Sequence, residues 1–174
     1  MQTYKAIGIL GNGAWGATLA KVLEKNGHKV LLWPENNNEQ KSFSDIVKQT
    51  TSLYEIANNC EIVIVAVPTT KFREVVYKLG NYIHGDQILI SSTKGLEADT
   101  YCSMSEILKE ESCVKKIGVL SGPGNIDEIS KDCPSGATIA SKYYEVIHKL
   151  RKYFDSANFK VYGSDDVIGV ELSG

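Results

Sequence analysis

Apolar and polar positions follow two patterns along this chain, and these patterns predict its secondary structure. Short apolar runs rich in β-branched residues predict strands, at residues 6–10, 29–33, 61–67, 87–91, 116–120, 136–140 and 159–162. Apolar residues at helical spacing predict helices over residues 17–25, 70–79, 102–109 and 142–154. Segment 44–58 has only some helical character and is expected to be a connection. Because strands and helices alternate, we predict an α/β fold with a mostly parallel sheet covered on both faces, and strand 61–67 at its centre.

The first predicted strand leads directly into a glycine motif. Gly11, Gly13 and Gly16 have the GxGxxG spacing between strand 6–10 and helix 17–25. The first glycine allows a tight turn, the second lets the backbone approach a pyrophosphate, and the third lets the helix pack close to the strand. Free N–H groups at the start of the helix then bind the phosphates. We therefore predict a Rossmann-type, doubly wound domain that binds a dinucleotide; the alternative is a glycine-rich turn without a ligand.

An acidic residue follows the second predicted strand. Glu35 lies past the glycine motif at close to the spacing of about 20 residues at which a carboxylate binds the ribose 2′-hydroxyl. No arginine stands nearby to accept a 2′-phosphate. The expected cofactor is therefore NAD or NADP, with NAD favoured. The alternative interpretation of Glu35 is a solvated loop carboxylate.

Composition and charge narrow the class of protein. The chain has 174 residues, of which 43% are hydrophobic, enough for one sizeable core, and we expect a single domain over residues 1–174. A formal net charge of −2 without a basic stripe argues against nucleic acid as a partner. The sequence has neither an apolar run of membrane-spanning length nor a signal-peptide pattern, so we expect no membrane insertion and a cytoplasmic location. Four scattered cysteines and three separated histidines predict neither a disulfide framework nor a metal site.

Most polar loops follow the ends of predicted strands. They cover residues 11–16, 68–71, 92–97 and 121–125. In open α/β sheets the ligand binds at that edge of the sheet. Lys94, just past a buried strand, is the best candidate there to hold a phosphate or share a proton with a hydroxyl. Its alternative interpretation is a solvated turn residue.

Together these loops resemble those of the bacterial NAD(P)-dependent glycerol-3-phosphate dehydrogenases. The matching segments occur in the family's order, at residues 11–20, 66–68, 92–97, 121–123, 137–141 and 162–172. The resemblance implies a cofactor domain followed, in full-length members, by a helical substrate domain, and is compatible with a homodimer. It also implies hydride transfer between NAD(P)H and dihydroxyacetone phosphate, a small phosphorylated triose, which gives sn-glycerol 3-phosphate for phospholipid synthesis.

The resemblance also implies roles for individual positions. Lys94 matches a catalytic lysine that contacts both cofactor and substrate, and Glu35 falls near the contact to the adenosine ribose. The implied cofactor contacts are Gly11, Asn12, Gly13, Ala14, Trp15, Gly16, Glu35, Pro68, Lys94 and Ile126. The implied substrate contacts are Lys94, Gly122 and Gly124.

Two departures from the family pattern affect these expectations. After residues 121–123 the family usually continues with Ser or Thr, then Phe and Ala, whereas this chain has Gly124, Asn125 and Ile126, so one substrate contact and one cofactor contact are altered. The family motif that contains residues 167–172 continues to a lysine that acts as the principal catalytic acid and base. The given sequence ends at Gly174, before that position. We therefore expect residues 1–174 to be a cofactor domain without the helical domain, and inactive alone.

Two other functions are open at this point. The first is a stand-alone, non-catalytic nucleotide-binding or sensor module, which the missing lysine and the altered loop at 124–126 favour. The second is a fragment of a β-hydroxyacid or 6-phosphogluconate-type dehydrogenase, against which the sequence at residues 92–95 argues.

Overall fold

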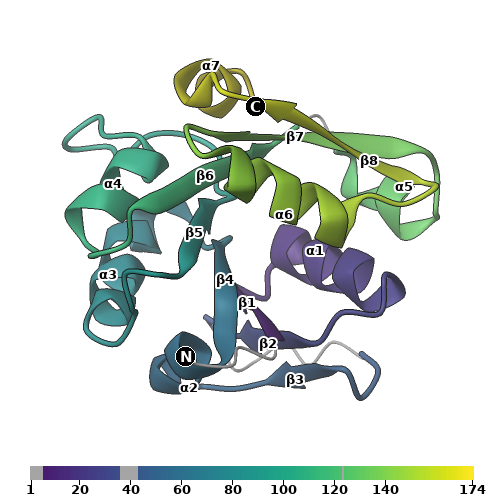
Figure 1. Cartoon of the computed structure of the whole chain (residues 1–174), viewed down its shortest axis with the longest axis horizontal. Helices are drawn as coiled ribbons and strands as arrows, with labels where there is room; N and C mark the ends of the chain where they lie inside the picture. The colour runs from purple at the N-terminus through teal and green to yellow at the C-terminus, as the bar shows by residue number, and fades with distance from the viewer. Residues whose placement is uncertain (1–5, 36–42, 123) are drawn as a thin grey trace.

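One eight-stranded sheet runs through the whole molecule (Figure 1). The computed structural model describes residues 6–35, 43–122 and 124–174. The sheet order is β3-β2-β1-β4-β5-β6-β7-β8. The strands are β1 (Ala6–Leu10), β2 (Val30–Trp33), β3 (Val47–Gln49), β4 (Cys60–Val65), β5 (Ile88–Ser91), β6 (Lys116–Ser121), β7 (Ser135–Ser141) and β8 (Phe159–Ser164).

The pairing of the strands confirms a mostly parallel sheet. Strands β1 to β6 pair in parallel, β7 runs antiparallel to β6, and β8 is parallel to β7. The chain places β2 on one side of β1 and β4 on the other, so the winding direction reverses at β1. In doubly wound sheets this reversal opens a crevice beyond the carboxyl ends of the strands, where ligands bind.

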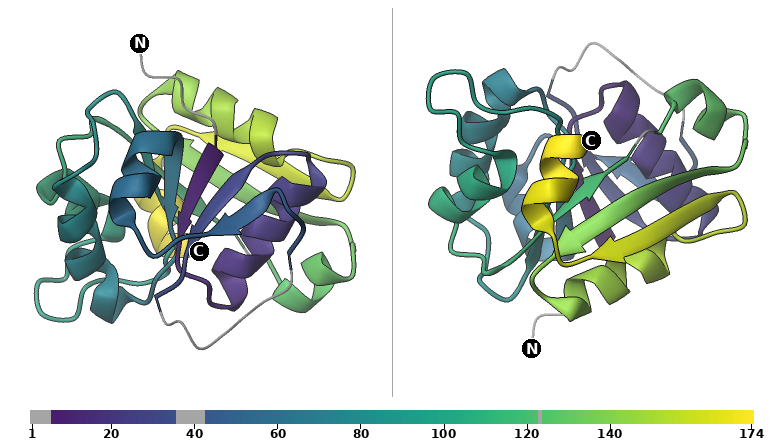
Figure 2. Two further views of the ribbon diagram at one scale, coloured as in Figure 1. Left: turned by 90° about the horizontal axis from the view of Figure 1, so that it is seen from below. Right: turned by 90° about the horizontal axis from the view of Figure 1, so that it is seen from above.

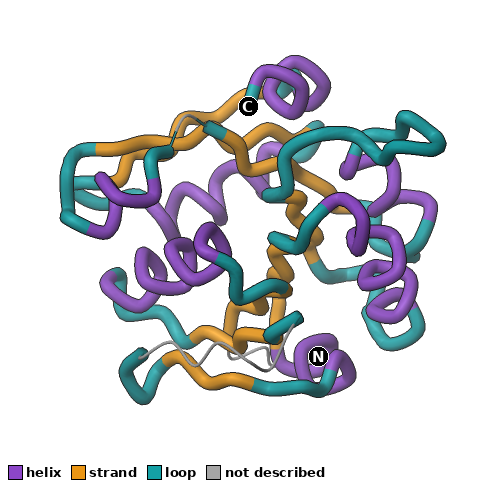
Figure 3. Tube along the Cα trace, turned by 180° about the vertical axis from the view of Figure 1, so that it is seen from behind, coloured by secondary structure: helices purple, strands orange, loops and turns teal. Residues whose placement is uncertain are grey.

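Helices cover both faces of the sheet (Figures 1 and 2). They are α1 (Ala14–Lys25), α2 (Leu53–Asn59), α3 (Thr69–Gly80), α4 (Met104–Glu110), α5 (Ile126–Ser130), α6 (Tyr144–Phe154) and α7 (Val167–Ser173). Figure 1 shows α1 and α6 on one side of the sheet and α3 and α4 on the other. In Figure 3, which views the molecule from behind, loops near the centre connect strand ends to these flanking helices.

The two faces of the sheet bury separate apolar clusters. In β4, Ile62 and Ile64 pack with the cluster that includes α1 and α6, whereas Val63 and Val65 pack with the cluster that includes α3 and α4. Successive side chains of a strand point to opposite faces, so a strand covered on both sides must be apolar at every position. This explains why the central strands appear in the sequence as continuous apolar runs.

The structure corrects the sequence-based assignment in several places. Segment 44–58, expected to be a connection, contains β3 and most of α2. Strand β3 has only three residues, of which Val47 alone is buried, so it is too short to produce a periodic pattern. Helices α5 and α7 were not predicted either, because each spans two turns at most. Helix α1 begins at Ala14, three residues before the predicted start.

Candidate functional site

A cleft of about 1000 Å³ opens where the loops after β1, β2, β4, β5 and β6 meet. This volume is at the upper end of the ordinary range for small-molecule sites, about 300–1,000 Å³. The cleft brings together most of the predicted site residues: Gly11, Asn12, Gly13, Ala14, Trp15, Glu35, Pro68, Lys94, Gly124 and Ile126. The remaining two, Gly16 and Gly122, lie beside it. Segments far apart in the sequence therefore meet at the edge of the sheet that the strand pattern indicated.

The glycines of the first loop meet different surroundings. Gly11 has a φ of +110°, and a Cβ atom there would lie 2.5 Å from the carbonyl oxygen of Ala66. A Cβ atom at Gly16 would lie 2.0 Å from the carbonyl oxygen of Gly11. At Gly13 a Cβ atom would meet nothing within 4 Å beyond its chain neighbours. Gly11 and Gly16 are thus required for packing of the protein itself, while Gly13 leaves space toward the cleft.

The N-terminus of α1 faces this space without a cap. Gly13 is the N-cap residue and makes no side-chain cap hydrogen bond, and the first turn contains no acidic residue. The first N–H groups of a helix have no partner within the helix, and its dipole places partial positive charge at that end. The loop and the helix start therefore form a site suited to an anion such as a pyrophosphate.

The indole of Trp15 lines the cleft and contacts the loop after β5. The Trp15 Nε1–H donates a hydrogen bond to Ser92 Oγ at 2.6 Å, which links the start of α1 to the loop after β5. A Cβ atom at Gly124 would lie 3.3 Å from two atoms of the Trp15 ring. The loop at Gly124 therefore packs closely on the indole, and a larger side chain at this position would require the ring to move.

Lys94 lines two neighbouring cavities. Its exposed side chain lines the cleft and also a small adjoining pocket. That pocket contains Gly122, so the structure brings the predicted substrate contacts Lys94 and Gly122 together, although Gly122 does not line the cleft itself. Glu171 of α7 lines the same small pocket. Pro123 lies outside the described residues.

Glu35 and Lys94 are the charged residues among those that line the cleft. Glu35 is half-buried just after β2, and Lys94 follows β5, so β1 and β4 lie between them in the sheet. The residues directly after Glu35, 36–42, lie outside the described part of the chain. A ligand that spans the cleft would meet a carboxylate at one end and an ammonium at the other.

Sequence reasoning did not assign five residues that line the cleft. These are Ala66, Val67, Thr69, Ser92 and Thr93. They follow β4 and β5 directly, and Thr69, Ser92 and Thr93 lie in loops 68–71 and 92–97, which the rule that ligands bind beyond the carboxyl ends of parallel strands had already indicated. Glu171, which lines the adjoining pocket, was not assigned a role, although it lies in the matching segment 162–172 that precedes the family's catalytic lysine.

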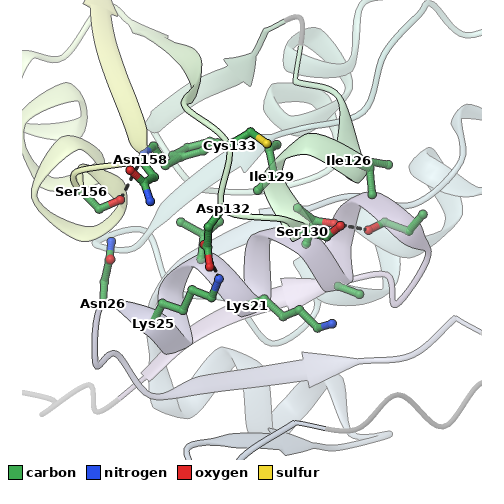
Figure 4. Close-up of a pocket in the computed structure, with 15 residues that line it drawn as sticks. Lys21, Lys25, Asn26, Ile126, Ile129, Ser130, Asp132, Cys133, Ser156 and Asn158 are labelled. Carbon is green, nitrogen blue, oxygen red and sulfur yellow. Dashed lines mark hydrogen bonds and ion pairs between the residues drawn. The ribbon is translucent and has the colours of Figure 1, made fainter.

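A second hollow, of about 250 Å³, lies between α1, α5 and the start of β8 (Figure 4). It shares Ala14 and Ile126 with the cleft. Its rim carries the ion pair between Lys25 and Asp132 (Figure 4). Because Gly13, Glu35 and Lys94 all line the cleft and none lines this hollow, we place the candidate site in the cleft.

The described residues hold no group of three or more His, Cys, Asp or Glu side chains arranged to bind a metal ion. Within the same part of the chain, no helix has the length and apolar character needed to span a bilayer. All four cysteines are free thiols. Burial raises the pKa of the Cys60 thiol to about 12, with a smaller contribution from Glu55, so this thiol is protonated at neutral pH.

Comparison with known proteins identifies related sequences over nearly the whole chain. The sequence model for the N-terminus of NAD-dependent glycerol-3-phosphate dehydrogenase matches residues 6–46 and 36–147. The glycerol-3-phosphate dehydrogenase [NAD(P)+] of Halothermothrix orenii is 34% identical over 97% of this chain and 53% of its own length. That of Fusobacterium nucleatum is 33% identical over 97% of this chain and 55% of its own length. The chain spans about half the length of these curated relatives.

Solved structures agree with the sequence matches. The crystal structure of glycerol-3-phosphate dehydrogenase from Coxiella burnetii superposes with a TM-score of 0.88 at 27% identity, over 97% of this chain and 56% of that one. A prephenate dehydrogenase from A. aeolicus, solved with hydroxyphenyl propionate and NAD+, superposes with a TM-score of 0.68 at 15% identity, over 93% of this chain and 60% of that one. The second likeness shows a shared fold alone.

Proposed function

Since this chain belongs to the family of NAD-dependent glycerol-3-phosphate dehydrogenases, we propose that its cleft binds NAD(H), with the pyrophosphate over the Gly11–Gly16 loop. The observation that carries this proposal is the open space at Gly13, in front of the uncapped start of α1. The backbone can approach a phosphate there, and the free N–H groups of the helix can bind it.

The two ends of the cleft would then bind the two ends of the dinucleotide. Glu35, beyond β2, would accept hydrogen bonds from the adenosine ribose, and its charge would repel the 2′-phosphate of NADP. The nicotinamide would reach the loops beyond β5, near Trp15 and Lys94, which line the same cleft. We propose that NAD is preferred over NADP for this reason.

For a protein that contains residues 1–174 together with a helical domain, we propose reversible reduction of dihydroxyacetone phosphate to sn-glycerol 3-phosphate. The cofactor supplies the hydride when it is bound. Lys94 would direct its ammonium at the substrate's carbonyl oxygen or phosphate and stabilise the charge that develops there. Gly122, which lines the pocket beside Lys94, would lie against the substrate backbone. A cytoplasmic location and a homodimer of the longer protein stay predictions.

A substitution at Gly13 tests the placement of the pyrophosphate. Gly13→Val should lower the affinity for NADH at least about tenfold, a loss of ~1.4 kcal/mol, because the side chain would occupy the space that the phosphates need. The fold should be unaffected, since the new side chain meets no protein atom beyond its chain neighbours within 4 Å of its Cβ. Titration calorimetry with NADH and thermal unfolding measure the two effects.

Gly85→Val is the matched control for this substitution. Gly85 is exposed before β5, at the other end of that strand from the cleft, and it does not line the cleft. NADH should bind this variant as it binds the unmodified chain. Equal affinity for NADH in Gly13→Val and the unmodified chain would refute the placement over the glycine loop.

The stand-alone sensor module is not favoured. The similarity to dehydrogenases extends over 97% of the chain and includes the loop that carries Lys94. A binding module without turnover would require none of the chemistry at that position.

A further inference from the structure

The loop that carries Lys94 is attached to the rest of the molecule on both sides of that residue. Before it, the Thr93 hydroxyl donates a hydrogen bond to the carbonyl oxygen of Val67 at 2.7 Å. After it, the backbone N–H of Glu97 donates to the carbonyl oxygen of Cys102 at 3.0 Å. Lys94 lies between these two attachment points. The position of Lys94 therefore depends on how firmly Glu97 is held.

Glu97 is held by an arginine of α3. Arg73 Nε donates to Glu97 Oε1 at 2.8 Å and Arg73 Nη2 donates to Glu97 Oε2 at 2.7 Å, which is a bidentate pair. The Glu97 side chain is only 17% exposed and the Arg73 side chain 31%. Thr100, within the same loop, also donates its hydroxyl to the Glu97 carboxylate. Paired in this two-point geometry and shielded from solvent, the two side chains restrict the loop more than a single exposed ion pair would.

The same guanidinium joins two more carboxylates. Arg73 Nη1 donates to Glu110 Oε2 at 2.8 Å and to Glu111 Oε1 at 2.5 Å, at the end of α4. One cation thus connects α3, the Lys94 loop and the end of α4. Without it, three carboxylates would face one another, so removal of Arg73 would both release the loop and introduce repulsion.

The first turn of α3 also reaches the site. Thr69, the first residue of the helix, lines the cleft, and a Cβ atom at Gly95 would lie 3.5 Å from Thr69 Cγ2. Arg73, one turn further along the helix, does not line the cleft. Its side chain acts on the Lys94 loop through Glu97.

We propose that Arg73 is a positioning residue for Lys94: by clamping Glu97 it fixes the loop so that the lysine ammonium lies in the cleft. The proposal rests on the proposed function, in which Lys94 contacts a phosphorylated substrate. The ion pair between Arg73 and Glu97 does not depend on that function, so the positioning role of Arg73 and the substrate role of Lys94 can be tested separately.

The test compares Arg73→Lys and Glu97→Gln with the unmodified 174-residue chain. Arg73→Lys keeps the charge and loses the two-point geometry, whereas Glu97→Gln keeps the shape and loses the charge. Hydrogen exchange of the amides at residues 95–102 should become about tenfold faster in both variants, which corresponds to ~1.4 kcal/mol less local opening free energy. The rate at which an acetylating reagent modifies Lys94, followed by peptide mass spectrometry, should rise in parallel with the exchange rate. If Arg73→Lys does not fold, Glu97→Gln alone decides.

Glu74→Gln is the matched control. Glu74 neighbours Arg73 on α3 and forms exposed ion pairs with Lys78 and Lys71, but it has no bond to the loop. Exchange at 95–102 and modification of Lys94 should be unchanged in this variant. Unchanged exchange and unchanged modification in Arg73→Lys and Glu97→Gln would overturn the proposal.

A second arm separates this proposal from the proposed function. In a longer protein that includes a helical domain, glycerol 3-phosphate added with NADH should slow the modification of Lys94 and protect it less in the Arg73→Lys variant. No protection in that longer protein, together with faster loop exchange in the variants of residues 1–174, would contradict the substrate role of Lys94 and leave the clamp supported as a purely structural device.

Discussion

Within the loop between β1 and α1, glycines at different positions serve different physical purposes. Gly11 and Gly16 allow two backbone segments to approach each other, as the contacts of a Cβ atom at each position show. Gly13 instead borders open space in the cleft. The motif therefore combines a packing requirement with the binding requirement that we propose for Gly13, and substitutions can separate the two.

Gly16→Ala should destabilise the protein. Alanine ordinarily improves a helix interior by up to about 1 kcal/mol relative to glycine. Here its Cβ would lie 2.0 Å from the carbonyl oxygen of Gly11, a backbone atom that can move only if the loop moves. We expect a net loss of ~1–3 kcal/mol in the free energy of unfolding, as in overpacked sites. Urea unfolding measures it. Gly13→Ala should lie within about 0.5 kcal/mol of the unmodified chain, and a comparable loss in both variants would contradict this distinction.

Glu35→Gln should weaken the discrimination against NADPH. A charge at close range in a solvated site contributes on the order of 1 kcal/mol, so the ratio of the two dissociation constants should fall about fivefold. Titrations with NADH and NADPH at low ionic strength give this ratio. Glu74→Gln, outside the cleft, should leave it unchanged. Equal binding of the two cofactors by the unmodified chain would mean that Glu35 does not face the ribose.

At the scale of elements, the starts of two helices differ in how their free backbone N–H groups are satisfied. Helix α4 begins with a full capping box between Ser103 and Glu106, whereas α1 begins at Gly13 without any side-chain cap. A capped helix start is internally satisfied, and an uncapped one needs an external acceptor. Of these two starts, the uncapped one lies at the cleft, where an anionic ligand would supply the missing acceptors. Helices α3 and α6 also begin without a side-chain cap.

The clamp between α3 and the Lys94 loop should make stability depend on pH in the acid range. Hydrogen bonds from Arg73, and then from Thr100, hold the pKa of Glu97 at about 2, well below the ordinary value of a glutamate. A carboxyl group with a lowered pKa in the folded state stabilises the protein above its ordinary pKa, and this contribution is lost as the pH falls toward the lowered value. The melting-temperature difference between the unmodified chain and Glu97→Gln should thus be steady from pH ~8 to ~5 and shrink below about 4. A constant difference down to pH ~3 would contradict the assignment.

At the scale of the whole molecule, one sheet separates two apolar clusters, and helix α7 is hydrogen-bonded to helix α4. The Glu171 carboxylate of α7 is buried and accepts hydrogen bonds from Ser105 N at 2.8 Å and Ser105 Oγ at 2.6 Å. This bond connects α7 to the first turn of α4, next to the pocket that holds Lys94 and Gly122. The pocket beside Lys94 is therefore assembled from segments that lie far apart in the sequence.

We expect residues 1–174 to bind NADH without reducing dihydroxyacetone phosphate at a measurable rate. Half of the length of the relatives is not represented in this chain, and positioned proton transfer alone contributes a factor of about 10²–10⁴. A longer protein that includes a helical domain should be active, and Lys94→Ala should lower its turnover strongly. Oxidation of NADH, followed for the short and long proteins side by side, is the assay. Robust turnover by residues 1–174 would require a different proton donor within them.

The sequence by itself determined the types of most strands and helices, the mostly parallel sheet and the edge that carries the candidate site. These features depend on local periodicity and on motif spacing, because a buried strand must be apolar throughout and a pyrophosphate loop needs glycine at set positions. It did not reveal β3, α5 or α7, which are too short for a periodic signal.

Only the tertiary structure decided which residues meet. The bond between Trp15 and Ser92, the clamp of Arg73 on Glu97, and the tie of Glu171 to Ser105 join residues that no spacing rule relates. It also decided which glycine faces the protein and which faces the cleft. Such contacts are set by strand register and by the packing of helices on the sheet, and these arise from the burial of all the apolar side chains together rather than from any one segment.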